Sequence, residues 1–146
     1  MPVETVESLT LNIVKEIQIA APMPVVFESV LEQIGPGMTR PDGEPMHGKI
    51  EPWPGGRWYR DLGNNTGHFW GHVQVIKPPT LLELSGPMFM SYAAINFVQY
   101  RLQEKGRGTL LTLTHRALGD IIPEHREGVQ MGWQHFVDAI KRRAEK

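Results

Sequence analysis

Apolar and polar residues alternate along most of the chain, and the few departures from alternation mark the helices. In residues 9–20, LTLNIVKEIQIA, leucines and isoleucines fall mainly on every second position, which predicts a half-buried strand. In residues 25–35, VVFESVLEQIG, the apolar spacing changes to three and four residues. This spacing predicts a short helix that ends at Gly35 or Pro36.

From about residue 47 onward the apolar period is two. Six further segments have the composition of strands: MHGKIEPW (46–53), GGRWYRDL (55–62), HFWGHVQVIKP (68–78), TLLELSG (80–86), AAINFVQYRLQEK (93–105) and GTLLTLTHRAL (108–118). The segments NNTG (64–67) and KGRG (105–108) are turn signals, because Asn and Gly tolerate positive φ. Consecutive strands joined by such turns predict an antiparallel sheet.

The longest helical pattern closes the chain, over about residues 124–144. Its apolar positions recur at helical spacing, at Val129, Trp133, Phe136, Val137 and Ile140. A helix of this length is about 30 Å long and must bury its apolar stripe against a sheet face. The expected fold class is therefore α+β, a curved antiparallel sheet of six or seven strands around a long C-terminal helix, with a short helix after the first strand.

Composition narrows the possible chemistry. The 146 residues suit one domain, expected to span 1–146, and the formal net charge of -1 does not favour a nucleic-acid partner. The chain has no cysteine, which excludes thiolate catalysis, cysteine-ligated zinc and disulfides. No apolar run approaches the ~18 residues of a membrane span. MPVETVESLT does not have the pattern of a signal peptide, so we expect a cytoplasmic protein with no membrane association.

Four segments, in this order, carry a resemblance to a known family. They are IVKEIQIAAPMPVVFESVL, PGGRW, GHVQVIKPPTLLEL, and GTLLTLTHRAL followed by GVQMGWQHFVDAIK. Together they resemble START-like (SRPBCC) domains, and most closely the group named after the heat-shock-protein-90 ATPase activator. The resemblance implies a helix-grip fold with a cavity between sheet and helix. Members of the superfamily include lipid and hormone binders, aromatic polyketide cyclases and a co-chaperone domain, so the fold leaves the function open.

The segment 54–72, PGGRWYRDLGNNTGHFWGH, carries the densest set of polar and aromatic side chains. Strand alternation predicts that His68, Trp70 and His72 share one face. The two histidines would then stand about 13 Å apart, too far to ligate one metal ion. We therefore expect no metal site. The preceding strand presents either Arg57-Tyr59-Asp61 or Trp58-Arg60-Leu62 to the cavity, and the sequence does not decide which face.

Three other features invite a functional interpretation. His115 shares a strand face with two leucines, so it should point inward, as a general base or, more often for such a residue, as a satisfied core histidine. The apolar segment GPMFMSY (86–92) suggests a lid over a pocket, a dimer contact or a core plug. Gly128 and Gly132 on the last helix would let the sheet or a ligand approach the helix backbone.

The first hypothesis is binding of a small hydrophobic or amphipathic ligand between sheet and C-terminal helix. The residues expected to line the cavity or its entrance are Trp53, Trp58, Trp70, Met88, Phe89, Tyr92, Tyr100, His115 and Trp133. An alternative is a cyclase, lyase or hydrolase that uses His115, His72 and Asp61 as candidate catalytic residues. A third, a chaperone-associated module, follows only from the family resemblance. No cofactor is expected, and a homodimer is left open.

Overall fold

The strands form one antiparallel sheet, and the helices pack on one side of it. The computed structural model describes residues 6–146, and in that range the sheet has seven strands in the order β1-β7-β6-β5-β4-β3-β2. The elements are η1 (Glu7–Leu9), β1 (Thr10–Ile19), α1 (Met23–Ile34), β2 (Gly48–Ile50), β3 (Arg57–Gly63), β4 (Thr66–Lys77), β5 (Leu81–Gly86), β6 (Ala94–Lys105), β7 (Gly108–Gly119) and α2 (Pro123–Ala144). The predicted α+β helix-grip architecture is confirmed.

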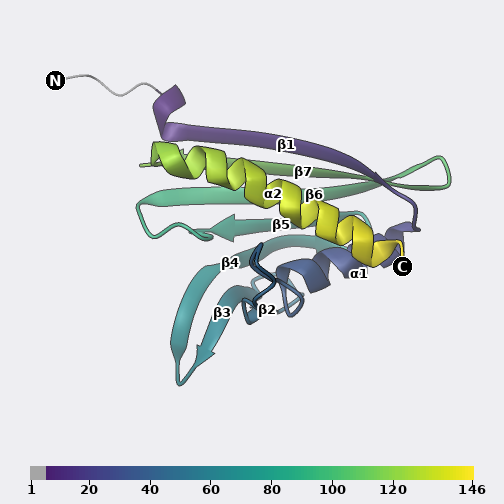
Figure 1. Ribbon diagram of the computed structural model, residues 1–146, viewed down its shortest axis with the longest axis horizontal. Coiled ribbons are helices and arrows are strands. Elements are labelled where there is room, and N and C mark those ends of the chain that lie inside the picture. The colour runs from purple at the N-terminus through teal and green to yellow at the C-terminus, as the bar shows by residue number, and fades with distance from the viewer. Residues whose placement is uncertain (1–5) are drawn as a thin grey trace.

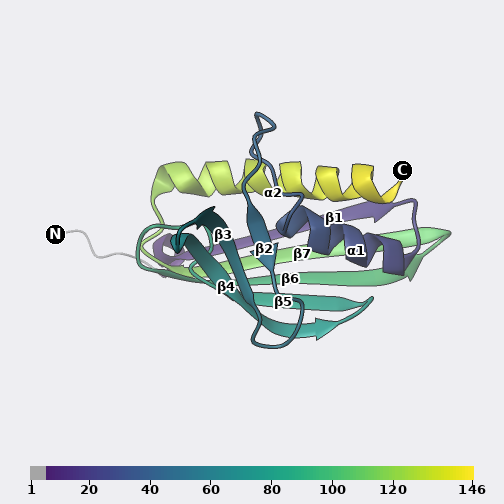
Figure 2. The ribbon, with the colours of Figure 1, turned by 90° about the horizontal axis from the view of Figure 1, so that it is seen from below.

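Helix α2 lies across the sheet, and α1 packs against its C-terminal half (Figure 1). The segment 36–47 between α1 and β2 rises beside the middle of α2 (Figure 2). A single bridge between Thr39 and Pro45 closes this segment into a small loop. None of the helices within residues 6–146 is both long and apolar enough to cross a bilayer.

One row of side chains across the inner sheet face shows why the alternation predicted the core. Ile13, His115, Val98 and Leu84 pair in turn on β1, β7, β6 and β5, and each is at most 2% exposed. Because strand side chains alternate between faces, the residues next to them in sequence point away from α2. The row is apolar except for His115, so the position of this histidine requires a polar partner.

Helix α2 divides its apolar stripe between two neighbours. Trp133, Val137 and Ile140 are buried against the sheet and α1, which provides the burial that holds a helix of this length in place. Val129 and Phe136 lie beside this stripe and are only partly buried. The half-buried side of α2 is the side that borders the cavity described below.

A bulge in β4 changes the predicted face of the β3–β4 hairpin. Trp58 pairs with Gly71, whereas Tyr59 pairs with Phe69, so Trp70 is an extra residue in β4. Trp70 is buried, and His72 turns to the outer face, where its ring lies 4.9 Å from that of Phe69. The prediction that His72 shares a face with Trp70 is therefore wrong, because strict alternation does not continue through a bulge.

The inward face of β3 is the one that carries Trp58, Arg60 and Leu62. Trp58 is fully buried, and its indole N–H donates to the carbonyl oxygen of Ile34 at 2.7 Å. Only the start of this face reaches the core, since Leu62 near the hairpin tip is 48% exposed. The outer face, Arg57-Tyr59-Asp61, is exposed or half-buried and faces away from α2.

Gly71 allows β4 and β5 to approach each other closely where the sheet bends. A Cβ atom built on Gly71 would lie 2.5 Å from the carbonyl oxygen of Ser85, a distance that side chains do not tolerate. The close approach places the end of β5 against the bulge at Trp70. The backbone N–H of Met88 then donates to the carbonyl oxygen of Trp70 at 2.8 Å, which fixes the segment after β5 beneath α2.

Candidate ligand-binding cavity

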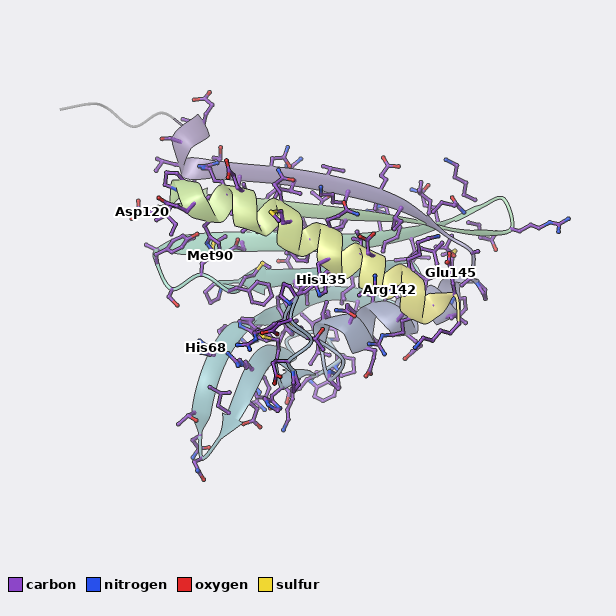
Figure 3. The ribbon with its side chains drawn as sticks, in the orientation of Figure 1. His68, Met90, Asp120, His135, Arg142 and Glu145 are labelled. Atoms are coloured by element: carbon purple, nitrogen blue, oxygen red, sulfur yellow. The ribbon has the colours of Figure 1, made fainter. Side chains whose placement is uncertain are left out.

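A cavity of about 320 Å³ lies between α2, the loop 38–46 and the segment 88–90. This volume falls in the range of small-molecule sites. In Figure 3, Met90 on the segment after β5 and His135 on α2 mark two of its walls. The lining is mainly apolar, and comprises Met38, Thr39, Arg40, Pro41, Met46, Met88, Phe89, Met90, His115, His125, Gly128, Val129, Gly132, Trp133, His135 and Phe136.

The glycines of α2 form part of the cavity wall. A Cβ atom built on Gly128 or Gly132 would meet no heavy atom within 4 Å. His125 and His135 border the same cavity and continue the stripe at helical spacing, three residues before and three residues after the glycine pair. At Gly128 and Gly132 the backbone of α2 therefore faces the cavity directly, with His125 before this pair and His135 after it.

The segment 88–90 covers the cavity with three large apolar side chains. Met88 and Met90 are 5% and 7% exposed, whereas Phe89 is 38% exposed and meets the rings of Trp70 and Phe136 edge-on, with centroids at 5.0 and 6.2 Å. Met88 adopts a left-handed backbone conformation, φ 56°, which is uncommon for a residue with a side chain. The segment thus packs within its own chain, and the predicted dimer contact remains a prediction.

His115 is fully partnered at the back of the cavity. The indole Nε1–H of Trp133 donates to His115 Nδ1 at 2.8 Å, and His115 Nε2 lies 2.7 Å from Asn96 Oδ1. Because an indole nitrogen can only donate, Nδ1 must be the acceptor, and Nε2 carries the proton that Asn96 accepts. Burial, and then the nearby His125, lower the pKa of His115 to about 4.

The polar groups nearer the entrance come from α2, the loop 38–46 and the connection between β5 and β6. The Tyr92 hydroxyl forms a hydrogen bond with His125 Nδ1 at 2.6 Å, and burial raises the pKa of this phenol. His135 Nε2 is buried and has no hydrogen-bond partner among residues 6–146. Arg40 forms a 2.9 Å ion pair with Asp42 at the rim. These groups offer a ligand a small number of hydrogen-bonding positions.

The predicted ligand-lining residues are distributed over several sites. Met88, Phe89, His115 and Trp133 line the cavity. Trp70 lies behind Phe89, and Trp58 and Tyr100 are fully buried in the core outside the lining. Tyr92 is outside the lining and contacts His125, which belongs to it, and Trp53 is 55% exposed in the β2–β3 connection. Aromatic residue type alone did not distinguish a core position from a cavity position.

The structure does not bring the three candidate catalytic residues together. Asp61 lies on the outer face of β3, where its carboxylate binds Lys49 at 2.8 Å and its pKa is lowered mainly by that hydrogen bond. His72 is exposed, with Nδ1 3.1 Å from the carbonyl oxygen of Gly55. His115 is buried on β7, three strands away from β4, and its ring nitrogens are engaged. Such an arrangement does not form an acid–base cluster.

Sequence reasoning missed the residues that complete the cavity. They are Met38, Met46, His125 and His135, together with Arg40 at the rim. His125 and His135 had an available signal, because they continue the helical stripe of the two glycines. The contribution of the loop 38–46 had no such signal, since its Pro- and Gly-rich sequence gives no indication of where the loop packs.

The sheet that grips a long C-terminal helix over a cavity is the helix-grip architecture that the resemblance to START-like (SRPBCC) domains implied. Residues 44–145 match the model of a protein family described as "Activator of Hsp90 ATPase homolog 1-like protein". The match covers more than half of the chain, and the chain belongs to this family. No curated protein sequence matches the chain significantly.

Solved structures with the same fold have low sequence identity to the chain. CalU16 from Micromonospora echinospora is 24% identical, with a TM-score of 0.64, over 91% of this chain and 75% of CalU16. An uncharacterised protein from Rhizobium leguminosarum is 16% identical, with a TM-score of 0.70, over 93% and 95% of the two chains. The di-domain ARO/CYC StfQ of the steffimycin biosynthetic pathway is 10% identical, with a TM-score of 0.66, over 96% of this chain and 51% of StfQ. These likenesses support the fold.

Proposed function

We propose that this protein binds a small hydrophobic or amphipathic molecule in the cavity between α2, the loop 38–46 and the segment 88–90. The observation that carries the proposal is the side-chain-free stretch of α2 at Gly128 and Gly132, which faces a cavity with methionine and phenylalanine walls. Glycine in a helix interior costs up to ~1 kcal/mol relative to alanine. Two glycines with open space in front of them are consistent with a role in admitting a ligand.

The wall composition supports an apolar ligand body. Met38, Met46, Met88 and Met90 all border the space, and methionine side chains adapt to ligands of different shape. The buried Nε2 of His135, which has no partner among the described residues, suits a ligand hydrogen-bonding group near the middle of α2. We favour binding over catalysis, because the candidate acid–base residues lie apart and burial keeps His115 neutral by lowering its pKa.

A fluorescent-probe titration tests the proposal. N-phenyl-1-naphthylamine is neutral and largely apolar, and its emission rises when it leaves water. The wild-type protein should bind the probe saturably, and Gly132→Leu should weaken binding by about tenfold or more, because a leucine side chain would fill the space in front of Gly132.

Gly132→Ala is the matched control, since it adds one methyl group and should change affinity much less. A Gly132→Leu variant that folds and binds the probe with wild-type affinity would contradict the proposal.

A further inference from the structure

A second hollow, of about 400 Å³, is bordered by the same segment 88–90 as the apolar cavity. The two spaces share four wall residues, Met46, Met88, Phe89 and Met90. The second hollow is completed by the β3–β4 hairpin and the ends of the covering segment, through Arg60, Gly67, His68, Phe69, Trp70, Pro87 and Ser91. It therefore adjoins the apolar cavity and has a more polar wall.

Arg60 and His68 place two basic side chains at this wall. They are direct partners across β3 and β4, and they lie on the inward face that also carries Trp58 and Trp70. Figure 3 shows His68 on this hairpin. The Arg60 Nε–H donates to the carbonyl oxygen of Met46 at 3.1 Å, which orients the guanidinium, and within residues 6–146 its two terminal nitrogens remain for another acceptor.

Among residues 6–146, no acidic side chain balances the charge on this face. No aspartate or glutamate lines the second hollow, and Arg60 takes part in none of the ion pairs within residues 6–146. The neighbouring outer face differs, because there Arg57 pairs with Glu51 and Lys49 with Asp61, at 2.9 and 2.8 Å. The cations on the outer face are thus paired with carboxylates, whereas Arg60 on the inward face can bind an anionic ligand.

We propose that Arg60 and His68 form an anion subsite, which binds the carboxylate, phosphate or sulfonate group of an amphipathic ligand whose apolar body occupies the first cavity. This inference rests on the proposed function and adds the class of ligand. The terminal nitrogens of a guanidinium match two oxygens of such an anion, and a charge-assisted hydrogen bond is stronger beside an apolar wall than in open water. The shared methionine and phenylalanine wall lets one molecule contact both spaces.

Two related probes separate the apolar and anionic contributions. The probe 8-anilinonaphthalene-1-sulfonate has the same ring systems as N-phenyl-1-naphthylamine and adds a sulfonate. Arg60→Gln should weaken binding of the anionic probe by about tenfold or more and leave the neutral probe within twofold. Binding of the anionic probe to the wild type should also weaken as salt is raised, because the subsite is partly exposed.

The control is Arg116→Gln, which removes the same charge from the exposed outer face of β7. It should leave both probes unchanged. Arg60→Lys keeps the charge but loses the paired terminal nitrogens of the guanidinium, so we expect an intermediate affinity for the anionic probe. This variant carries the test if Arg60→Gln does not fold.

The outcomes distinguish the two proposals. Suppose that Gly132→Leu weakens binding of the neutral probe, but Arg60→Gln or Arg60→Lys binds the anionic probe with wild-type affinity. The anion subsite is then overturned and the proposed function stands. Equal losses in Arg60→Gln and Arg116→Gln would also overturn the subsite, because they would report general charge attraction. If Gly132→Leu binds the neutral probe with wild-type affinity, the proposed function fails, and the subsite fails with it as part of that function.

Discussion

Trp133 on α2 donates a hydrogen bond from its indole nitrogen to Nδ1 of His115 on β7, across the contact between helix and sheet. His115 in turn donates a hydrogen bond from Nε2–H to Asn96 Oδ1, so the only polar residue in a buried apolar row is satisfied without carrying a charge. The hydrogen bond between Trp133 and His115 fixes α2 to β7 at the back of the cavity. Both ring nitrogens of this inward histidine therefore have partners within the chain.

The neutral state of His115 predicts a dependence of stability on pH. Because the pKa of His115 falls from 6.5 to about 4 on folding, the unfolded chain binds the extra proton between these values. The contribution of His115 to stability is complete above pH 6.5 and declines as pH falls toward 4, by up to about 3 kcal/mol. Urea unfolding at pH 7.5, 6 and 5 measures this decline.

His115→Gln should flatten this part of the pH profile because it removes the titrating ring. His68→Gln, at an exposed position, should keep the wild-type slope. Equal slopes in His115→Gln and the wild type would contradict the account of His115 as a buried neutral base.

Trp133→Phe should destabilise the protein by about 1–3 kcal/mol, because it removes the donor and leaves His115 Nδ1 buried without a hydrogen bond. Trp53→Phe is the control, since Trp53 is 55% exposed and the same substitution should change stability little. Chemical unfolding at pH 7.5 compares them. Similar stabilities for the two variants would show that the indole–imidazole bond contributes nothing measurable.

Gly132→Leu should separate stability from binding. The substitution raises helix propensity by up to about 1 kcal/mol, and no atom within 4 Å opposes its Cβ, so the melting temperature should stay the same or rise. Probe affinity should fall in the same variant. Differential scanning fluorimetry without probe measures the melting temperature, and the fluorescence titration measures the affinity. A large fall in melting temperature would mean that Gly132 is required for packing.

Gly71→Ala should lower stability by about 1–3 kcal/mol, because the added Cβ would collide with the backbone carbonyl of Ser85. Since the β4–β5 pairing orders the segment that follows β5, amide hydrogen exchange at Met88 should also speed up. Gly55→Ala is a poorer comparison because of its positive φ, so Gly132→Ala serves as the control. Wild-type exchange at Met88 in a stable Gly71→Ala variant would refute this role of the close approach.

Much of the fold could be predicted from local pattern. The strand of residues 9–20 and the helix of residues 124–144 agree with β1 and α2 to within about a residue at each end. The inward position of His115 followed from alternation with two leucines. These features depend on neighbours close in sequence, and a sheet face or helix stripe imposes its period directly on those neighbours.

The site could be predicted only in part, because it depends on contacts between distant segments. The bulge at Trp70 reverses the orientation of His72, and the apolar–polar pattern of that strand does not predict the extra residue. The loop 38–46 reaches α2 through tertiary packing, so Met38 and Met46 could not be assigned to the cavity. Trp58 was expected at the cavity, but its indole N–H bonds the end of α1, a partner 24 residues away.

The most direct test of the central claim is a crystal structure of the protein with bound N-phenyl-1-naphthylamine. The account predicts that the ring systems lie against the backbone of α2 at Gly128 and Gly132, beneath Met88 and Phe89. Probe bound instead to the outer sheet face, where Ile95 and Leu118 form an exposed cross-strand pair, would contradict it.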